Sequence, residues 1–119
     1  MGSIRRRPRK AAAIELDGFE NLRQAFHARL ESERVHFVTL SAALARAKED
    51  ATEVFQELVL RAHKLHAGAA ILEIPEIAGA ADSLEQAATR ASKSHAINSD
   101  PSVWDALATL VYQIGAECR

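Results

Sequence analysis

The apolar residues between positions 50 and 72 recur at alternating steps of three and four, and this spacing constrains the fold more than any other feature. It follows the 3.6-residue period of an α-helix and predicts one helix over about residues 50–72 with a single apolar seam. Asp50, with Glu53 three residues later, forms a capping-box-like start. The seam consists of Phe55, Leu58, Ala62, Leu65, Ala69 and Leu72. A helix with such a seam requires other helices to cover it.

Three further segments have the same helical period. Residues 19–47 are expected to form one kinked helix or two successive helices, and another helix begins at Pro75. Asp100 and Pro101 provide an N-cap and a first-turn proline for the last helix. The positions predicted to face the core are Phe19, Leu22, Phe26, Leu30, Phe37, Leu40, Leu44, Ala47, Ile77, Ala81, Leu84, Ala88, Ala91, Val103, Leu107, Leu110 and Ile114. The predicted fold class is all-α: an antiparallel up-and-down four-helix bundle with an additional N-terminal helix.

The length and composition agree with a single helical domain. The chain has 119 residues, of which 48% are hydrophobic and only 5% aromatic, so a core must be built from closely spaced aliphatic residues and alanine. We expect this domain to span residues 17–119. Residues 1–16 are expected to form a basic, disordered arm, because Pro8 disfavours a helix within its run of arginines.

The uneven charge of the chain bears on the class of partner. Residues 5–10 hold five basic residues, which leaves ten basic and sixteen acidic residues elsewhere, a net charge of −6. An acidic body argues against a nucleic-acid-binding domain. Cys118 has no second cysteine to pair with, and no apolar run approaches the about 20 residues that span a bilayer. We therefore expect a cytoplasmic protein that does not enter a membrane.

No metal site and no ATP site are predicted. Glu33 and His36 form a single Glu-x-x-His pair, whereas a di-iron bundle needs two such pairs. His63 and His66 have a spacing that permits metal binding on a helix, but the sequence indicates no carboxylate or thiolate ligand near them. No glycine-rich phosphate loop followed by Lys-Ser or Lys-Thr occurs, so the chain is not expected to be an enzyme that uses ATP.

His63 lies on the side of the predicted 50–72 helix that faces away from the apolar seam. At 100° per residue it is roughly 130° from the centre of the seam. Its surroundings on this outer face are small or aliphatic, which suits a nucleophile that a partner protein must approach closely. The residues expected to form this binding face are Gln56, Val59, Leu60, Ala67, Ala70 and Ile71. The alternative is an ordinary boundary histidine on a helix that is buried on two sides.

The stretch from Leu60 to Ala69 resembles the phosphoacceptor motif of histidine-containing phosphotransfer (HPt) domains. In that motif a histidine follows a small residue, a leucine comes two positions later, and glycine and small residues follow. The resemblance continues into the next helix and covers about residues 19–116. The residues that carry it are His63, Leu65, Gly68 and Ala69, with Ile77, Ala81, Leu84 and Glu85 in the next helix.

This resemblance implies a phosphocarrier with no cofactor of its own. His63 would accept a phosphoryl group from a receiver-domain aspartate or a histidine kinase and pass it to another receiver domain, with Mg²⁺ held by the receiver. The partners would be a response-regulator receiver domain, a hybrid histidine kinase, or both, and the carrier itself would be a monomer. Lys64 and His66 are the side chains placed to stabilise the phosphoryl group.

Two positions depart from the family pattern, and they keep other functions open. His66 stands where lysine is usual, and Ala67 stands where glycine is usual. The departures suggest a pseudo-HPt adaptor, which would bind a receiver or kinase through the same face without accepting phosphate. A third possibility is a structural bundle that dimerises through Leu60 and Ile71.

Overall fold

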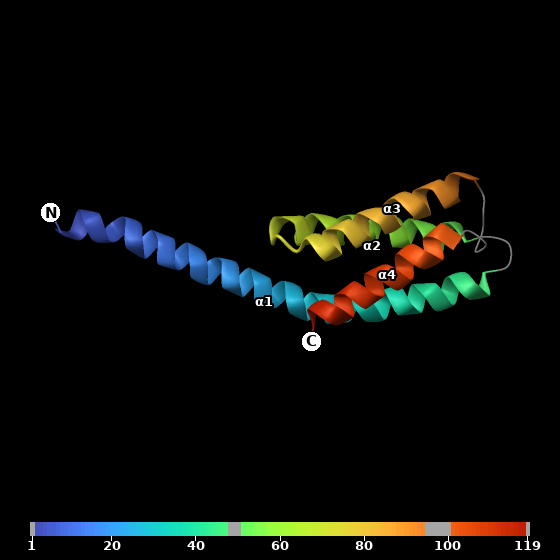
Figure 1. The fold of residues 1–119 in the computed structure, drawn as a ribbon, viewed down its shortest axis with the longest axis horizontal. Helices are drawn as coiled ribbons and strands as arrows, with labels where there is room; N and C mark the ends of the chain where they lie inside the picture. Colours follow the sequence, from blue (N-terminus) through green and yellow to red (C-terminus); the bar gives the residue numbers. More distant parts are fainter. Residues whose placement is uncertain (1, 48–50, 95–100, 119) are drawn as a thin grey trace.

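The described part of the chain forms four helices and contains no strand. The computed structural model describes residues 2–47, 51–94 and 101–118. The helices are α1 (Gly2–Arg46), α2 (Thr52–Ile71), α3 (Pro75–Ser94) and α4 (Pro101–Glu117) (Figure 1). The predicted all-α fold class is confirmed. The starts of α2, α3 and α4 lie within about two residues of the predicted starts, and α2 ends one residue before its predicted end.

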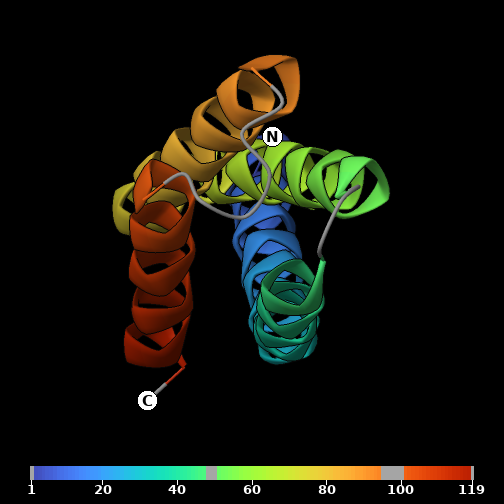
Figure 2. The same ribbon diagram turned by 90° about the vertical axis from the view of Figure 1, so that its right-hand side faces the viewer.

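The four helices run alternately in opposite directions. Each helix packs on the next one along the chain, and α1 also packs on α4, which closes the bundle. Figure 1 shows α2 and α3 as one layer and α4 with the second half of α1 as the other. The view along the long axis shows α4 and α1 beside each other below the α2–α3 pair (Figure 2). This is the predicted antiparallel up-and-down arrangement.

α1 is one continuous helix of 45 residues. The additional N-terminal helix expected from the sequence is therefore not a separate element. Residues 2–16 are helical where the sequence analysis expects a disordered arm. They extend beyond the bundle along the longest dimension of the molecule, which is 71 Å (Figure 1). Pro8 removes one backbone hydrogen bond there, but the three alanines at 11–13 have the highest intrinsic helix propensity. The boundary between an arm and a domain at residue 16 stays a prediction.

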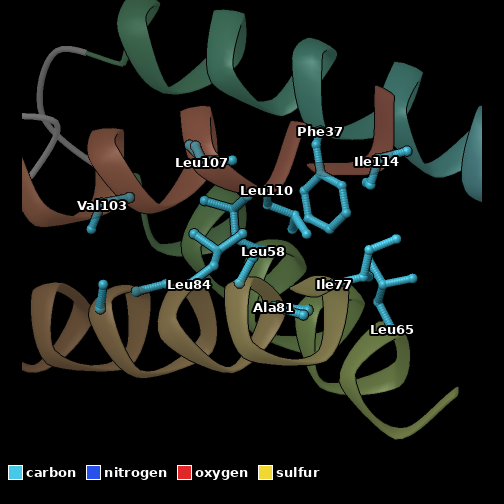
Figure 3. Close-up of a cluster of buried hydrophobic side chains, with 14 of the residues drawn as sticks. Phe37, Leu58, Leu65, Ile77, Ala81, Leu84, Val103, Leu107, Leu110 and Ile114 are labelled. Atoms are coloured by element: carbon cyan, nitrogen blue, oxygen red, sulfur yellow. The ribbon is translucent and has the colours of Figure 1, made fainter. Parts of the chain in front are cut away.

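The core is formed by the seams that the sequence predicts on α2, α3 and α4. Every predicted core residue on these three helices is buried. Figure 3 shows several of these side chains, among them Leu58, Leu110 and Ile114, near Phe37 of α1 between the two layers. On α1 the prediction is wrong at its first two positions, because Phe19 is 38% exposed and Leu22 is 61% exposed. Burial on α1 begins at Phe26, where the helix first packs against the rest of the bundle.

The turn between α2 and α3 fixes the register of these two helices. Ile74 donates its backbone N–H to the Ala69 carbonyl oxygen at 2.9 Å, and Glu73 donates to Ala70 at 3.2 Å. Glu73 has a φ of 57°, in the left-handed region. These three features define a Schellman motif, in which a residue after the helix reverses the chain and the next apolar residue, here Ile74, is buried. The short turn brings α3 back along α2.

The start of α2 differs from the predicted capping box. The N-cap residue is Ala51, and it makes no side-chain capping hydrogen bond because it has no polar side chain. Asp50 and Asp100, the two predicted caps, lie outside the described residues. Ala51 is itself buried in the core, so its apolar packing contributes to the stability of this helix end, which has no polar side-chain cap at Ala51.

Candidate functional site

His63 projects from the outer side of α2 into solvent. Its side chain is 66% exposed, whereas Ala62 and Leu65 on the same turn are fully buried. The helix therefore uses one side for the core and presents the imidazole on another. This exposure excludes the ordinary buried or boundary histidine considered from the sequence.

Glu85 of α3 fixes one nitrogen of the exposed imidazole. Nδ1 of His63 lies 3.0 Å from Oε1 of Glu85, whose side chain is 25% exposed. Because an ionised carboxylate only accepts hydrogen bonds, Nδ1 is the donor in this pair. A neutral imidazole that carries its proton on Nδ1 has an unprotonated Nε2. The contact thus selects Nε2 as the nitrogen with a free lone pair.

A groove between α2 and α3 begins at His63. It has a volume of about 460 Å³ and is mainly apolar, and we call it the His63 groove. One wall comes from α2 and the other from α3. Its lining residues are Phe55, Gln56, Val59, Leu60 and His63 on α2, and Glu85, Thr89, Ser92 and Lys93 on α3. An exposed apolar groove beside an accessible imidazole is a suitable surface for a protein partner.

The residues predicted to bind a partner fall into three groups. Gln56, Val59 and Leu60 line the His63 groove. Ala67 and Ala70 are exposed on the next turns of α2 but do not line this groove. Ile71 is 73% exposed and lines a different groove of about 300 Å³, between α2 and α1. The structure therefore does not bring Ile71 together with the residues at His63.

The α3 wall of the groove was largely missed by the sequence analysis. Glu85 was noticed only as part of a resemblance, and Thr89 and Ser92 were not singled out. A signal exists, because these three residues follow each other at steps of four and three and so form a polar stripe on α3 beside its alanine-rich buried side. The stripe marks the edge of the helix interface, where polar side chains can reach a site on α2.

Two lysines lie on different sides of His63, and the sequence analysis assigns phosphoryl stabilisation only to the first of them, Lys64. Lys64 is exposed and is about 100° around α2 from His63, away from α3. Lys93 lines the far end of the His63 groove, about 12 Å along α3 from Glu85. Of these two lysines, only Lys64 is adjacent to His63 on its own helix.

His66 faces two carboxylates, contrary to the expectation that no such ligand lies near it. One ligand atom each from His66, Asp82 and Glu85 lies within 4.8 Å of the others, and all three residues are half-buried. The prediction failed because it considered only neighbours on the same helix. The antiparallel packing of α3 on α2 supplies both acidic side chains from a segment about 20 residues away in the chain.

Arg61 ties the site helix to α1. Its Nη1 lies 3.0 Å from Oε1 of Glu33, and its Nε lies 2.6 Å from Oε1 of Glu57. Glu33 is only 8% exposed and is a buried acidic residue in the core layer of α1. His36 is exposed, and Glu33 is paired with Arg61. The glutamate of this Glu-x-x-His pair therefore has a structural role in holding α2 to α1.

Gly68 is required by the packing of α1 on α2. A Cβ atom built on Gly68 would lie 2.7 Å from Cε1 of Phe26. Carbon atoms do not approach this closely, so a larger residue would displace the Phe26 ring. The glycine in the resemblance motif is therefore explained by the close approach of an aromatic ring from α1.

An antiparallel helical bundle that presents an exposed histidine beside an apolar groove is the arrangement expected of a class of proteins, the histidine phosphotransfer modules. The family model of the Hpt domain matches residues 16–117, and the chain belongs to this family. Searches of curated proteins and of solved structures gave no match. Hpt domains are phosphocarriers of two-component phosphorelays that interact with receiver domains and kinases, and they have no ATP-binding site of their own.

Within residues 2–47, 51–94 and 101–118, no helix combines the length and the apolar character that crossing a bilayer requires.

Proposed function

We propose that this chain is a phosphorelay intermediate and that His63 is its phosphoacceptor. The observation that carries the proposal is the pairing of an exposed imidazole with Glu85 through Nδ1. His63 would receive a phosphoryl group from the aspartyl phosphate of a receiver domain or from a histidine kinase. It would then transfer the group to the aspartate of another receiver domain.

The transfer step follows from the tautomer that Glu85 selects. The lone pair of Nε2 attacks phosphorus, so an N–P bond forms while the bond between phosphorus and the aspartate oxygen breaks. The aspartate leaves as a carboxylate, and the proton on Nδ1 stays hydrogen-bonded to Glu85. The negative charge of Glu85 offsets the positive charge that develops on the ring. Transfer to the next receiver is the reverse of the same step.

The partner would supply the remaining electrostatic stabilisation. Mg²⁺ held by receiver-domain carboxylates would neutralise the phosphoryl oxygens during transfer. On this chain we assign a supporting role to Lys64, whose long stem allows its ammonium to approach those oxygens. His66 is the weaker candidate, because the two carboxylates next to it oppose an anionic group at this position.

The His63 groove would dock the partner. Leu60 provides exposed apolar area next to the imidazole, the half-buried Val59 adds to it, and Gln56 provides a polar contact at the rim. Ala67 and Ala70 have small exposed side chains, which leave room for the body of a receiver domain above His63. Because the partner would bind at this face, the carrier would be a monomer when no partner is bound.

The direct test is transfer from a phosphorylated receiver domain. We expect label on this chain that is stable in base and labile in acid, as an N–P bond requires, and we expect no label on His63→Gln. His36→Gln is the matched control, because it removes an exposed histidine on α1, and it should be labelled like the wild type. Label that persists on His63→Gln and disappears on His66→Gln would overturn the acceptor assignment.

The departures at His66 and Ala67 make the adaptor the alternative to test beside the carrier. An adaptor would bind its receiver equally well as wild type and as His63→Ala, and neither form would take label. A carrier is labelled as wild type and passes the label on. Sedimentation of the unlabelled chain completes the comparison, because a stable dimer that covers Leu60 would block the groove required by both functions.

A further inference from the structure

We infer that His66, Asp82 and Glu85 form a binding site for a divalent transition-metal ion of the zinc class. The site lies on the seam between α2 and α3, one helical turn from His63. His66 comes from α2, while Asp82 and Glu85 lie one turn apart on α3. The three ligands thus converge from two helices whose register is fixed by the turn at Glu73.

The distances fit a site that closes around a metal ion. The three ligand atoms lie within 4.8 Å of one another. In a tetrahedral zinc site with Zn–N and Zn–O bonds of about 2.0–2.2 Å, ligand atoms are about 3.3 Å apart. Rotation of the two half-buried carboxylate side chains, with shifts of about 1 Å in their oxygen atoms, would bring the ligand atoms to this spacing without moving either helix. Three protein ligands leave a fourth position for water.

The charges of the described residues favour a cation between these ligands. Asp82 and Glu85 are like charges at a spacing of three on one helix, which repel each other. Asp82 accepts a hydrogen bond from the neutral amide of Gln86, and Glu85 accepts one from His63. Among the residues that the structure describes, no lysine or arginine forms an ion pair with either carboxylate. A bound dication would relieve this repulsion.

The donor set selects the class of metal. One imidazole nitrogen with two carboxylate oxygens suits Zn²⁺, Co²⁺, Ni²⁺ and Cu²⁺, whereas Mg²⁺ and Ca²⁺ prefer oxygen ligands alone. Mg²⁺ is therefore the negative control for this site. The Mg²⁺ that phosphotransfer requires belongs to the partner and would not compete here.

Glu85 links the metal site to the phosphoacceptor. The same carboxylate that would bind the metal accepts the hydrogen bond from Nδ1 of His63. Coordination would draw negative charge toward the metal and weaken this acceptor. Metal binding should therefore slow transfer at His63, a consequence that rests on the proposed function, while binding itself does not.

The site can be tested by competition for Zn²⁺ between untagged protein and a chromophoric chelator. We expect one equivalent to bind, and no competition from millimolar Mg²⁺. Loss of an outer-shell partner alone weakens metal sites by about 10–100-fold, so His66→Gln and Asp82→Asn should each weaken binding by at least about tenfold. Absence of Zn²⁺ binding to the wild type, or unchanged affinity in both variants, would overturn the site.

Control variants separate this site from other zinc ligands. His36→Gln and Cys118→Ser should bind like the wild type; burial raises the pKa of the Cys118 thiol, so it holds less of the thiolate that binds metal. His63→Gln removes a hydrogen bond to the ligand Glu85 but no ligand atom, so it should weaken binding less than His66→Gln does. If His63→Gln loses the metal while His66→Gln retains it, the ion belongs to His63 and the inferred site is wrong.

An imidazole ¹⁵N spectrum gives a readout that is independent of phosphotransfer. Addition of Zn²⁺ should shift a ring nitrogen of His66, identified by its loss in His66→Gln. Shifts confined to other histidines would contradict the site. A chain that binds Zn²⁺ at His66 but never takes phosphoryl label would refute the proposed function and leave the metal site intact.

Discussion

The Nδ1 atom of His63 and the Oε1 atom of Glu85 lie 3.0 Å apart, so an imidazole carried by α2 is oriented by a carboxylate of α3. The two residues are 22 positions apart in the sequence. Their contact depends on the register between the two helices, which the turn at Glu73 sets. The chemistry at His63 is therefore sensitive to changes in a neighbouring helix.

Replacing Glu85 should slow phosphotransfer without unfolding the protein. A typical hydrogen bond contributes about 0.5–1.5 kcal/mol, so Glu85→Ala should reduce the single-turnover rate from a phosphorylated receiver by about two- to tenfold. Glu85→Gln keeps an oxygen acceptor and should lie closer to the wild type. Glu76→Ala, an exposed acidic residue at the start of α3, serves as control and should have the wild-type rate. An unchanged rate in Glu85→Ala would exclude the orienting role.

Leu60 should be important for partner binding but not for stability. Its side chain is 49% exposed at the His63 groove, and aspartate at this position would place a charge in the apolar contact. We expect Leu60→Asp to weaken receiver binding by at least about tenfold, measured by titration calorimetry, with little change in melting temperature. Val38→Asp is the matched control, because Val38 is 53% exposed on α1. Equal weakening by both variants would argue against the groove as the docking surface.

Gly68→Ala should destabilise the bundle. The added Cβ would lie 2.7 Å from Cε1 of Phe26, and the ring is only 6% exposed, so it has little room to move. Overpacking of this kind costs about 1–3 kcal/mol, of which the higher helix propensity of alanine offsets up to about 1 kcal/mol; urea denaturation would detect the remaining loss. Gly79→Ala is the control, since its Cβ would meet nothing within 4 Å. That variant should gain up to about 1 kcal/mol from helix propensity, so the two changes should have opposite signs.

Glu73→Gly should stabilise the turn between α2 and α3. A non-glycine residue in the left-handed region costs about 1–2 kcal/mol, and Glu73 has a φ of 57°. Part of this gain is offset by the greater freedom of glycine in the unfolded chain, so we expect a net gain of about 0.5–1 kcal/mol. Arg90→Gly, at an exposed position inside α3, should instead lose about 1 kcal/mol. A loss of stability in Glu73→Gly would show that its side chain contributes more than the backbone strain costs.

Removal of Arg61 should reveal the buried charge of Glu33. Arg61→Met would leave Glu33 without the partner that lies 3.0 Å away. We expect the free energy of unfolding to fall by about 2–3 kcal/mol. This is less than the about 3–5 kcal/mol lost when a fully buried pair is broken, because Arg61 is 25% exposed. The double variant with Glu33→Met removes both charges and should recover most of this loss. Strictly additive effects in chemical denaturation would show that the two residues are not coupled.

The apolar period predicted most of the bundle. The seams from Phe55 to Leu72 and from Val103 to Ile114 are buried as expected, because burial of one side of a helix leaves a direct trace in residue spacing. The same period wrongly predicted that Phe19 and Leu22 are buried, because a helix with a regular apolar period can extend beyond the helices against which it packs. The reversal at Glu73 was also not predictable, because the usual sign of such a turn is a glycine.

Only the part of the candidate site that lies on α2 could be predicted from the sequence. His63 and the groove residues on its own helix, such as Leu60, could be found because neighbours on one helix are related by fixed spacing. Glu85, Asp82 and Thr89 approach from α3, and their positions depend on a helix register that spacing does not encode. The error about carboxylates near His66 has this same cause.

The groove at His63 is a single surface, and this has a kinetic consequence under the proposed function. A donor receiver and a recipient receiver would need the same imidazole and the same apolar walls, so they could not be bound at once. Transfer of each phosphoryl group would then require two successive binding events, in which the donor receiver dissociates before the recipient receiver binds. The rate of transfer through the relay would then depend on the abundance and phosphorylation level of the receivers that compete for this one groove.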